Sequence, residues 1–362
     1  MTTVAHDAGQ WVIGGVDTHK DFHVAAVVDV VGRVLGVETF PASRHGYRRL
    51  LSWMQSHGEV IGVGVEGCGS WGAGLARHLA ERAVKVVEVN RPNRQKRRLR
   101  GKSDPVDAEA AARAVLCGEA TVTPKTGTGP VEALRQLRVA RAGAVKARIS
   151  AANQLHSLCD TAPETIRAQL RRLPLRQKVE ICERWRPGSA YTPVNAAKRA
   201  MLSVARRWRA LDLEVRELDA HLKAILDGIA GPLLAKHGVG YETAGQLLVT
   251  AGDNPERMRS ERSYAALCGS SPVEASSGRT ERHRLNRGGD RQANAALWTI
   301  VLTRMSNHPP TRAYVARRTT EGLSKKEIIR CLKRYVAREV FPLVRAINDL
   351  EPSHNQTSQQ AA

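Results

Sequence analysis

The sequence predicts an α/β protein: a mixed sheet in its N-terminal part, a helical middle, and a mostly helical C-terminal part. Two observations predict this order. Near the N-terminus, short β-branched runs alternate with amphipathic stretches, as expected when strands and helices share one sheet. After residue 130, segments rich in Ala, Arg and Leu with helical spacing replace the β-branched runs.

Five strands and two helices are expected before residue 91. In chain order they are strands 11–19, 22–32 and 33–40, helix 43–58, strand 60–67, helix 71–83 and strand 84–90. The first three strands have short connections, which favour antiparallel pairing. Three antiparallel strands followed by alternating helix and parallel strand is the order of ribonuclease H-like domains, a similarity of fold that says nothing yet about function.

The chain is expected to divide into four parts. They are a sheet domain over 1–128, a helical and coiled-coil region over 129–230, a serine-containing domain over 231–345, and a disordered polar tail over 346–362. In the second part, apolar residues recur with spacing 4-3-4-3 from Leu211 to Ile229. The spacing fits a coiled-coil seam that would join a dimer or tetramer, or an amphipathic helix packed within its own domain.

Charge is the strongest global signal. The chain has 56 Lys and Arg residues against 35 Asp and Glu, for a net charge of +21. This excess predicts a polyanionic partner, usually nucleic acid, although some cationic proteins bind membranes or acidic partners. The sequence shows no apolar run of membrane-spanning length and no signal-peptide pattern, so we expect a cytoplasmic protein, associated with the nucleoid when bound to DNA. Six scattered cysteines without a CxxC pair are expected to be reduced core residues and not zinc ligands.

Four acidic residues stand where the elements of such a sheet end or begin. Asp17 lies in the first strand, Glu66 ends the fourth, and Asp104 and Asp107 open the helix after the fifth. In a ribonuclease H-like sheet these positions converge on one cleft. Clustered carboxylates repel one another, and Mg²⁺ or Mn²⁺ relieves that repulsion. Two such ions about 4 Å apart clamp the attacking and leaving oxygens of a phosphodiester.

Taken singly, these acids have plainer interpretations. Asp104 stands before a proline and is a good helix N-cap, Asp17 fits a turn, and Glu66 fits a surface. Four acids at positions that this fold brings together favour a metal site instead. Asp21, Asp29 and Glu59 do not fit the pattern and are interpreted as surface residues.

Two basic segments are candidate nucleic-acid contacts. The run RQKRRLRGK just before Asp104 contains Arg97, Arg98, Arg100 and Lys102. The stretch SSGRTERHRLNRGG contains Arg279, Arg282, Arg284 and Arg287. Its Ser276 and Ser277 precede a glycine, which lets a backbone approach closely, while the arginines would stabilise a phosphorane charge. A flexible phosphate-binding loop with incidental serines explains the same residue types equally well.

These motifs resemble the insertion-sequence transposases of the "one-ten" family, which are bridge-RNA-guided serine/DEDD recombinases. GVDTHKD, VEG and KSDPVDAEAAARA resemble the family's RuvC-like DEDD domain. GVGYETAGQLL, YAALCGSSPVEASSGRT and NRGGDRQANAALW resemble its transposase domain. One departure is CGSSP, where the family usually has an apolar residue after the glycine; we expect this to affect packing.

The resemblance implies a DNA recombinase that moves its own insertion sequence. Asp17, Glu66, Asp104 and Asp107 would be the DEDD metal ligands, and Ser277, with Ser276 as the alternative, would be the nucleophile. It further implies donor and target duplex DNA, a structured guide RNA, and a homo-oligomer in which the serine of one subunit completes the acidic site of another. Two alternatives remain open: a RuvC-like nuclease with water as nucleophile, and a basic architectural protein without catalytic activity.

Overall fold

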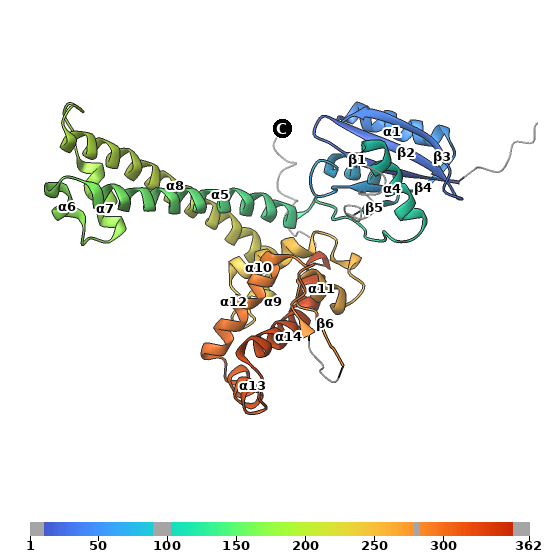
Figure 1. Cartoon of the computed structure of the whole chain (residues 1–362). Helices are drawn as coiled ribbons and strands as arrows, with labels where there is room; N and C mark the ends of the chain where they lie inside the picture. Colours follow the sequence, from blue (N-terminus) through green and yellow to red (C-terminus); the bar gives the residue numbers. More distant parts are fainter. Residues whose placement is uncertain (1–10, 90–102, 279–282, 350–362) are drawn as a thin grey trace, which may run out of the picture. The chain divides into compact units, whose positions relative to one another are not determined.

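A computed structural model describes residues 11–89, 103–278 and 283–349 of the chain (Figure 1). The chain forms two compact units. The first comprises residues 1–129 with 251–259, and the second comprises residues 130–250 with 260–362.

The first unit contains the mixed sheet that the sequence predicts. Its strands are β1 (Trp11–Thr18), β2 (Phe22–Asp29), β3 (Val34–Pro41), β4 (Glu59–Glu66) and β5 (Val86–Val89). They lie in the order β3-β2-β1-β4-β5. The β1–β2 and β2–β3 pairs are antiparallel, whereas β4 runs parallel to β1 and β5 parallel to β4. This is the strand order of a ribonuclease H-like fold, so the predicted fold class is confirmed.

Helices cover both faces of the sheet. On one face, α1 (Arg44–Ser56) and α2 (Ala73–Ala80) bury Val12, Val16, Val63 and Val65 in the main core of this unit. On the other face lies α4 (Asp104–Leu116), which packs across the central strands (Figure 1). The two sets of side chains alternate along each strand, as the pleat requires.

Two glycines let α4 lie unusually close to the sheet. A Cβ atom at Gly15 of β1 would lie 2.2 Å from the carbonyl oxygen of Ala108, and one at Gly64 of β4 would lie 2.6 Å from that of Ala111. Real Cβ atoms do not approach backbone this closely. The helix contributes alanines at the contact, so backbone meets backbone with little side chain between.

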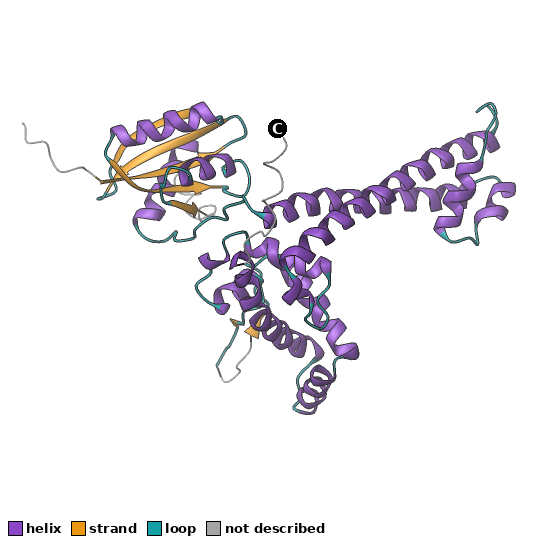
Figure 2. Ribbon diagram, turned by 180° about the vertical axis from the view of Figure 1, so that it is seen from behind, coloured by secondary structure: helices purple, strands orange, loops and turns teal. Residues whose placement is uncertain are grey.

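The second unit begins with a long antiparallel helical pair. Helix α5 (Pro130–Thr161) leads through α6 (Glu164–Leu170) and α7 (Leu175–Arg184) to α8 (Pro193–Ile229). Figures 1 and 2 both show α5 and α8 side by side. Ion pairs Arg141–Asp219 and Arg148–Asp212 fix their register, the second at 2.5 Å.

The expected seam faces the interior of this chain. Its Val215 and Leu222 are 3% and 5% exposed within one chain, where α8 packs along α5. This part of the seam fits the second interpretation, an amphipathic helix packed within its own unit. Leu211, Leu218, Ile225 and Ile229 of the same seam are only half-buried, so an oligomer joined by this seam stays a prediction.

The remaining elements are mostly helical, as predicted. They are α9 (Gly231–Leu234), α10 (Tyr241–Ala251), η1 (Pro255–Arg257), α11 (Glu261–Leu267), β6 (Val273–Glu274), β7 (His283–Arg284), α12 (Arg291–Asn307), α13 (Pro309–Thr320), α14 (Lys325–Arg345) and η2 (Ala346–Asp349). Helix α14 packs on α11 and α12. Across the described part of the chain, every helix is too short or too polar to cross a bilayer. All six cysteines are free, and four of them are buried.

Two histidines are buried against one tyrosine beside the main core. The rings of His23 and Tyr47 stack with centroids 5.6 Å apart. The ring centroid of His78 lies 5.7 Å from that of Tyr47. Neither ring nitrogen of His23 has a hydrogen-bond partner among the described residues. Burial lowers the pKa of both histidines, which favours their neutral forms in the folded chain.

This burial predicts acid sensitivity. The unfolded chain takes up a proton at His23 below about pH 6.5 while the folded chain resists it, so stability present above that pH is lost as the pH falls. The variant His23→Phe keeps the stacking on Tyr47 and should lose less unfolding free energy between about pH 7 and about pH 5. Urea titrations across that range measure it, with exposed His45→Gln as control. An unchanged pH slope in His23→Phe would contradict the assignment.

Candidate metal centre

Strand register places Asp17 and Glu66 side by side. Val16 of β1 pairs with Val65 of the parallel strand β4, so the next residues occupy matching positions. Gly15 and Gly64 face α4, and side chains alternate along a strand, so Asp17 and Glu66 lie on the α4 face. The hydroxyl of Thr18 donates to the backbone oxygen of Glu66 at 2.8 Å, which ties these two strand ends together.

The first turn of α4 brings two more carboxylates to the same end of the sheet. Ser103, with extended backbone, is the N-cap, so Asp104 is the first helical residue and not the cap. Asp107 lies one turn further and is 4% exposed. Both stand at the positive end of the helix dipole, which favours negative charge.

Asp17 and Asp104 meet around a histidine. The Nε2 atom of His19 lies 3.3 Å from Oδ2 of Asp17 and 3.4 Å from Oδ2 of Asp104. One ligand atom from each of the three side chains lies within 4.8 Å of the others. Sequence reasoning missed His19. The available signal was its position two residues after Asp17, which returns its side chain toward the same face.

The electrostatics of this cluster suit a divalent cation. Burial raises the pKa of Asp17, His19 opposes that shift, and the carboxylates of Asp107 and Asp104 raise the pKa further. Burial and the acidic neighbours therefore disfavour the ionised form of Asp17 relative to a free aspartate, and a bound cation would offset this effect. Carboxylate oxygens suit Mg²⁺ and Mn²⁺, and one imidazole nitrogen among them is a ligand for softer divalent metals. The donor set fits a divalent ion.

Asp29 was expected on the surface, and this prediction is wrong. It is 2% exposed, and its carboxylate accepts hydrogen bonds from the backbone N–H groups of Val31 and Arg33, at 3.0 and 2.8 Å. The guanidinium of Arg33 also pairs with it at 2.8 Å. These bonds lower the pKa of Asp29 and close the turn between β2 and β3. Its role is structural.

The serine segment extends from a short pair of strands, in which Val273 of β6 pairs with Arg284 of β7. Ser276 and Ser277 are exposed. The following Gly278 has φ +56, and a Cβ atom at this glycine would meet nothing within 4 Å. The backbone there is open to a close approach.

The two earlier serines of this region have structural roles. Ser270 is 9% exposed and donates to the backbone oxygen of Ala265 at 3.2 Å. Ser271 accepts from the amide of Asn286 at 3.0 Å. The unusual polar residue after Gly269 is thus accommodated by a hydrogen bond to α11.

The predicted nucleic-acid contacts are only partly visible. Arg284 and Arg287 are exposed. The other six lie outside the described residues: Arg97, Arg98, Arg100, Lys102, Arg279 and Arg282.

Comparisons with known proteins agree with this arrangement. Residues 14–162 match a transposase family model, that of the DEDD transposases of IS110. Residues 232–316 match the model of the transposase IS116/IS110/IS902 family. A Streptomyces coelicolor protein, the uncharacterized 43.6 kDa protein of insertion element IS110, is 30% identical over 147 residues. That match covers 40% of this chain and 36% of the relative. Both family models match, in this order along the chain, and the chain belongs to the IS110 family of transposases.

Proposed function

We propose that this protein cleaves and rejoins DNA strands to move an insertion sequence, with Mg²⁺ or Mn²⁺ held by Asp17, Glu66, Asp104 and Asp107. The observation that carries the proposal is the grouping of Asp17, His19 and Asp104, whose ligand atoms lie within 4.8 Å of one another. Glu66 and Asp107 are not members of this group, and their role as ligands is part of the proposal. Membership of a DEDD transposase family supports it.

The residues would divide the work as follows. When bound, divalent ions supply charge stabilisation at the scissile phosphate. Asp17 and Asp104 hold them, and His19 orients both carboxylates. The hydroxyl of Ser277, or of Ser276 as the alternative, gives up its proton to solvent as its Oγ atom bonds to phosphorus, and the bond from phosphorus to one bridging oxygen breaks. The departing oxygen takes up a proton, and the phosphoserine link conserves bond energy for strand exchange.

The proposed nucleophile and the proposed metal ligands belong to different compact units. Catalysis requires both to act on one phosphodiester. We therefore propose a homo-oligomer in which the serine of one subunit serves the acids of another, as the family resemblance implies.

Target choice by a structured guide RNA is also part of the proposal. The net charge of +21 supports binding of RNA and DNA backbones. The guide itself rests on the family resemblance alone.

Replacing one acid should reduce metal binding without destabilising the metal-free fold. The variant Asp17→Asn loses a ligand but also loses a strained charge, so its metal-free form should be at least as stable as the wild type. At a free ion concentration about 100 times Kd, the wild type should gain about 2.7 kcal/mol in unfolding free energy, and the variant far less. Chemical unfolding with and without Mn²⁺ measures both, and exposed Asp21→Asn is the matched control. Equal stabilisation of all three proteins by Mn²⁺ would contradict the proposed metal site.

A covalent adduct tests the serine. After reaction with DNA carrying the ends of its insertion sequence, denaturing gels should show protein joined to DNA. Ser277→Ala should abolish the adduct, and Ser276→Ala should retain it. Loss only in Ser276→Ala would exchange the two assignments. Cleaved ends without any adduct in the wild type would instead favour a nuclease that uses water.

A further inference from the structure

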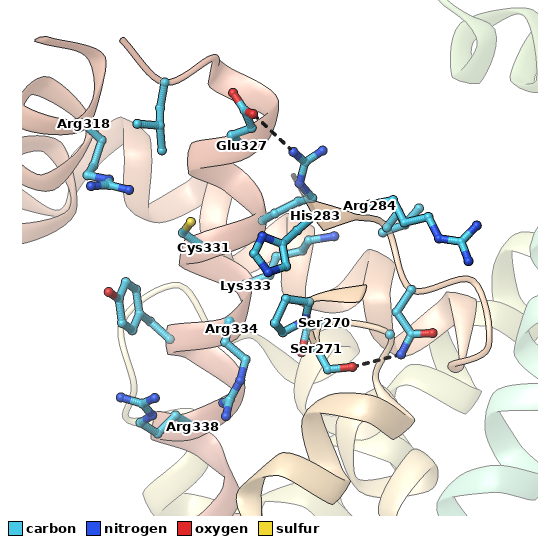
Figure 3. Close-up of a pocket in the computed structure, with 17 residues that line it drawn as sticks. Ser270, Ser271, His283, Arg284, Arg318, Glu327, Cys331, Lys333, Arg334 and Arg338 are labelled. Atoms are coloured by element: carbon cyan, nitrogen blue, oxygen red, sulfur yellow. Dashed lines mark hydrogen bonds and ion pairs between the residues drawn. The ribbon is translucent and has the colours of Figure 1, made fainter. Parts of the chain in front are cut away.

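A deep basic cavity lies in the second unit, beside the strands from which the serine segment extends. Its volume is about 590 Å³, and Figure 3 shows its walls. Helix α14 and the end of α13 form one wall, while β7 and the Ser270–Ser271 turn form the other. Six Lys and Arg residues line it: Arg284, Arg318, Arg330, Lys333, Arg334 and Arg338.

Nearby carboxylates neutralise only part of this charge. Glu261 pairs with Arg334 and lies 3.9 Å from Arg338. Glu327 lies 3.8 Å from Arg330, and Glu321 pairs with Arg318. Three carboxylates thus serve four of the six cations, and Arg284 and Lys333 have no carboxylate partner among the described residues.

Two donors of the cavity are incompletely paired: the ammonium of Lys333 has no counter-charge, and the Nε–H of Arg318 has no acceptor, among the described residues. Lys333 is 5% exposed, and its ammonium donates to the side-chain oxygen of Asn294 at 2.8 Å, a neutral acceptor. Burial lowers the pKa of Lys333, and the neighbouring Arg330 lowers it further. The buried Nε–H of Arg318 has no acceptor among the described residues. Both situations are costly, and an anion in the cavity relieves both.

The geometry favours phosphate as that anion. Guanidinium groups and an ammonium that line one cavity are donors that suit the oxygens of a phosphate group. The cavity adjoins His283 and Arg284 of β7, and these lie on the chain segment that carries Ser276 and Ser277. A nucleic-acid strand lying along the serine segment would bring its own neighbouring phosphates to this opening.

We propose that this cavity binds a backbone phosphate of a nucleic-acid strand, with Lys333 as its buried cation and the partly exposed Arg318 and the exposed Arg284 in its walls. The inference rests on the proposed function only in that its ligand is nucleic acid. It requires neither the metal centre nor the serine chemistry.

Salt-dependent binding tests the proposal. We would measure the affinity of the intact protein for a short DNA duplex, a single DNA strand and a single RNA strand, without divalent ions so that no cleavage occurs. The variants are Lys333→Met, which keeps the apolar stem, and Arg284→Gln, which is exposed and spares the fold. The control is Arg312→Gln, an exposed position of α13 outside the cavity.

We expect Lys333→Met and Arg284→Gln to weaken binding and to flatten the slope of log affinity against log salt, by about 0.9 on the duplex or about 0.7 on a single strand. Arg312→Gln should leave the slope unchanged. The polymer on which the flattening occurs identifies the strand as DNA or RNA.

Two results would overturn the proposal: unchanged slopes in both cavity variants, as expected if the cavity holds a protein side chain or a small anion, or equal flattening in all three variants, which indicates a general charge effect. If Lys333→Met fails to fold, Arg284→Gln decides alone. Because no cleavage is measured, a missing serine adduct would leave this result standing.

Discussion

Helix α4 lies directly on the sheet because Gly15 and Gly64 present no side chain to it. A methyl group at either position would overlap the helix backbone, at 2.2 and 2.6 Å from carbonyl oxygens. The helix would then have to move outward or tilt. Its first turn carries Asp104 and Asp107, so any such movement would withdraw both from Asp17. The candidate metal centre depends on this one packing contact.

The packing of α4 on the sheet has an electrostatic cost, because it brings the carboxylates of Asp104 and Asp107 close to that of Asp17. The sheet is held by an apolar core on its opposite face, which does not involve the acids. The acids themselves gather where the raised pKa of Asp17 shows that its charge is disfavoured. The positive end of α4 and the ring of His19 reduce this cost. A divalent cation would reduce it most, which is the expected design of a site that gives up stability for binding.

The second unit also gathers incompletely balanced charge at one place, but there the charge is positive. There, Lys333 and the Nε–H of Arg318 are buried with too few carboxylates to balance the cations around them. The acidic cluster of the first unit therefore has unbalanced negative charge, and the basic cavity of the second unit has unbalanced positive charge. The first suits metal ions, and the second suits the backbone of a polyanion.

Much of the fold was predictable, because period-two runs and amphipathic stretches are local signals. All five strands and the acids at their ends follow from them. The partner of the α8 seam did not, since α5 lies far away in sequence and the same spacing serves either one chain or two. Asp29 was misplaced because a turn closed by a buried carboxylate and Arg33 looks, in sequence, like a polar surface. His19 and the basic cavity were missed, because both depend on side chains that only folding brings together.

The most direct test is a crystal structure of the protein soaked with Mn²⁺, with the ion located by its anomalous signal. We expect a peak in coordination contact with the carboxylates of Asp17 and Asp104, at the N-terminal end of α4. Ordered density for all these side chains with no manganese among them, or with manganese bound elsewhere, would contradict the central claim.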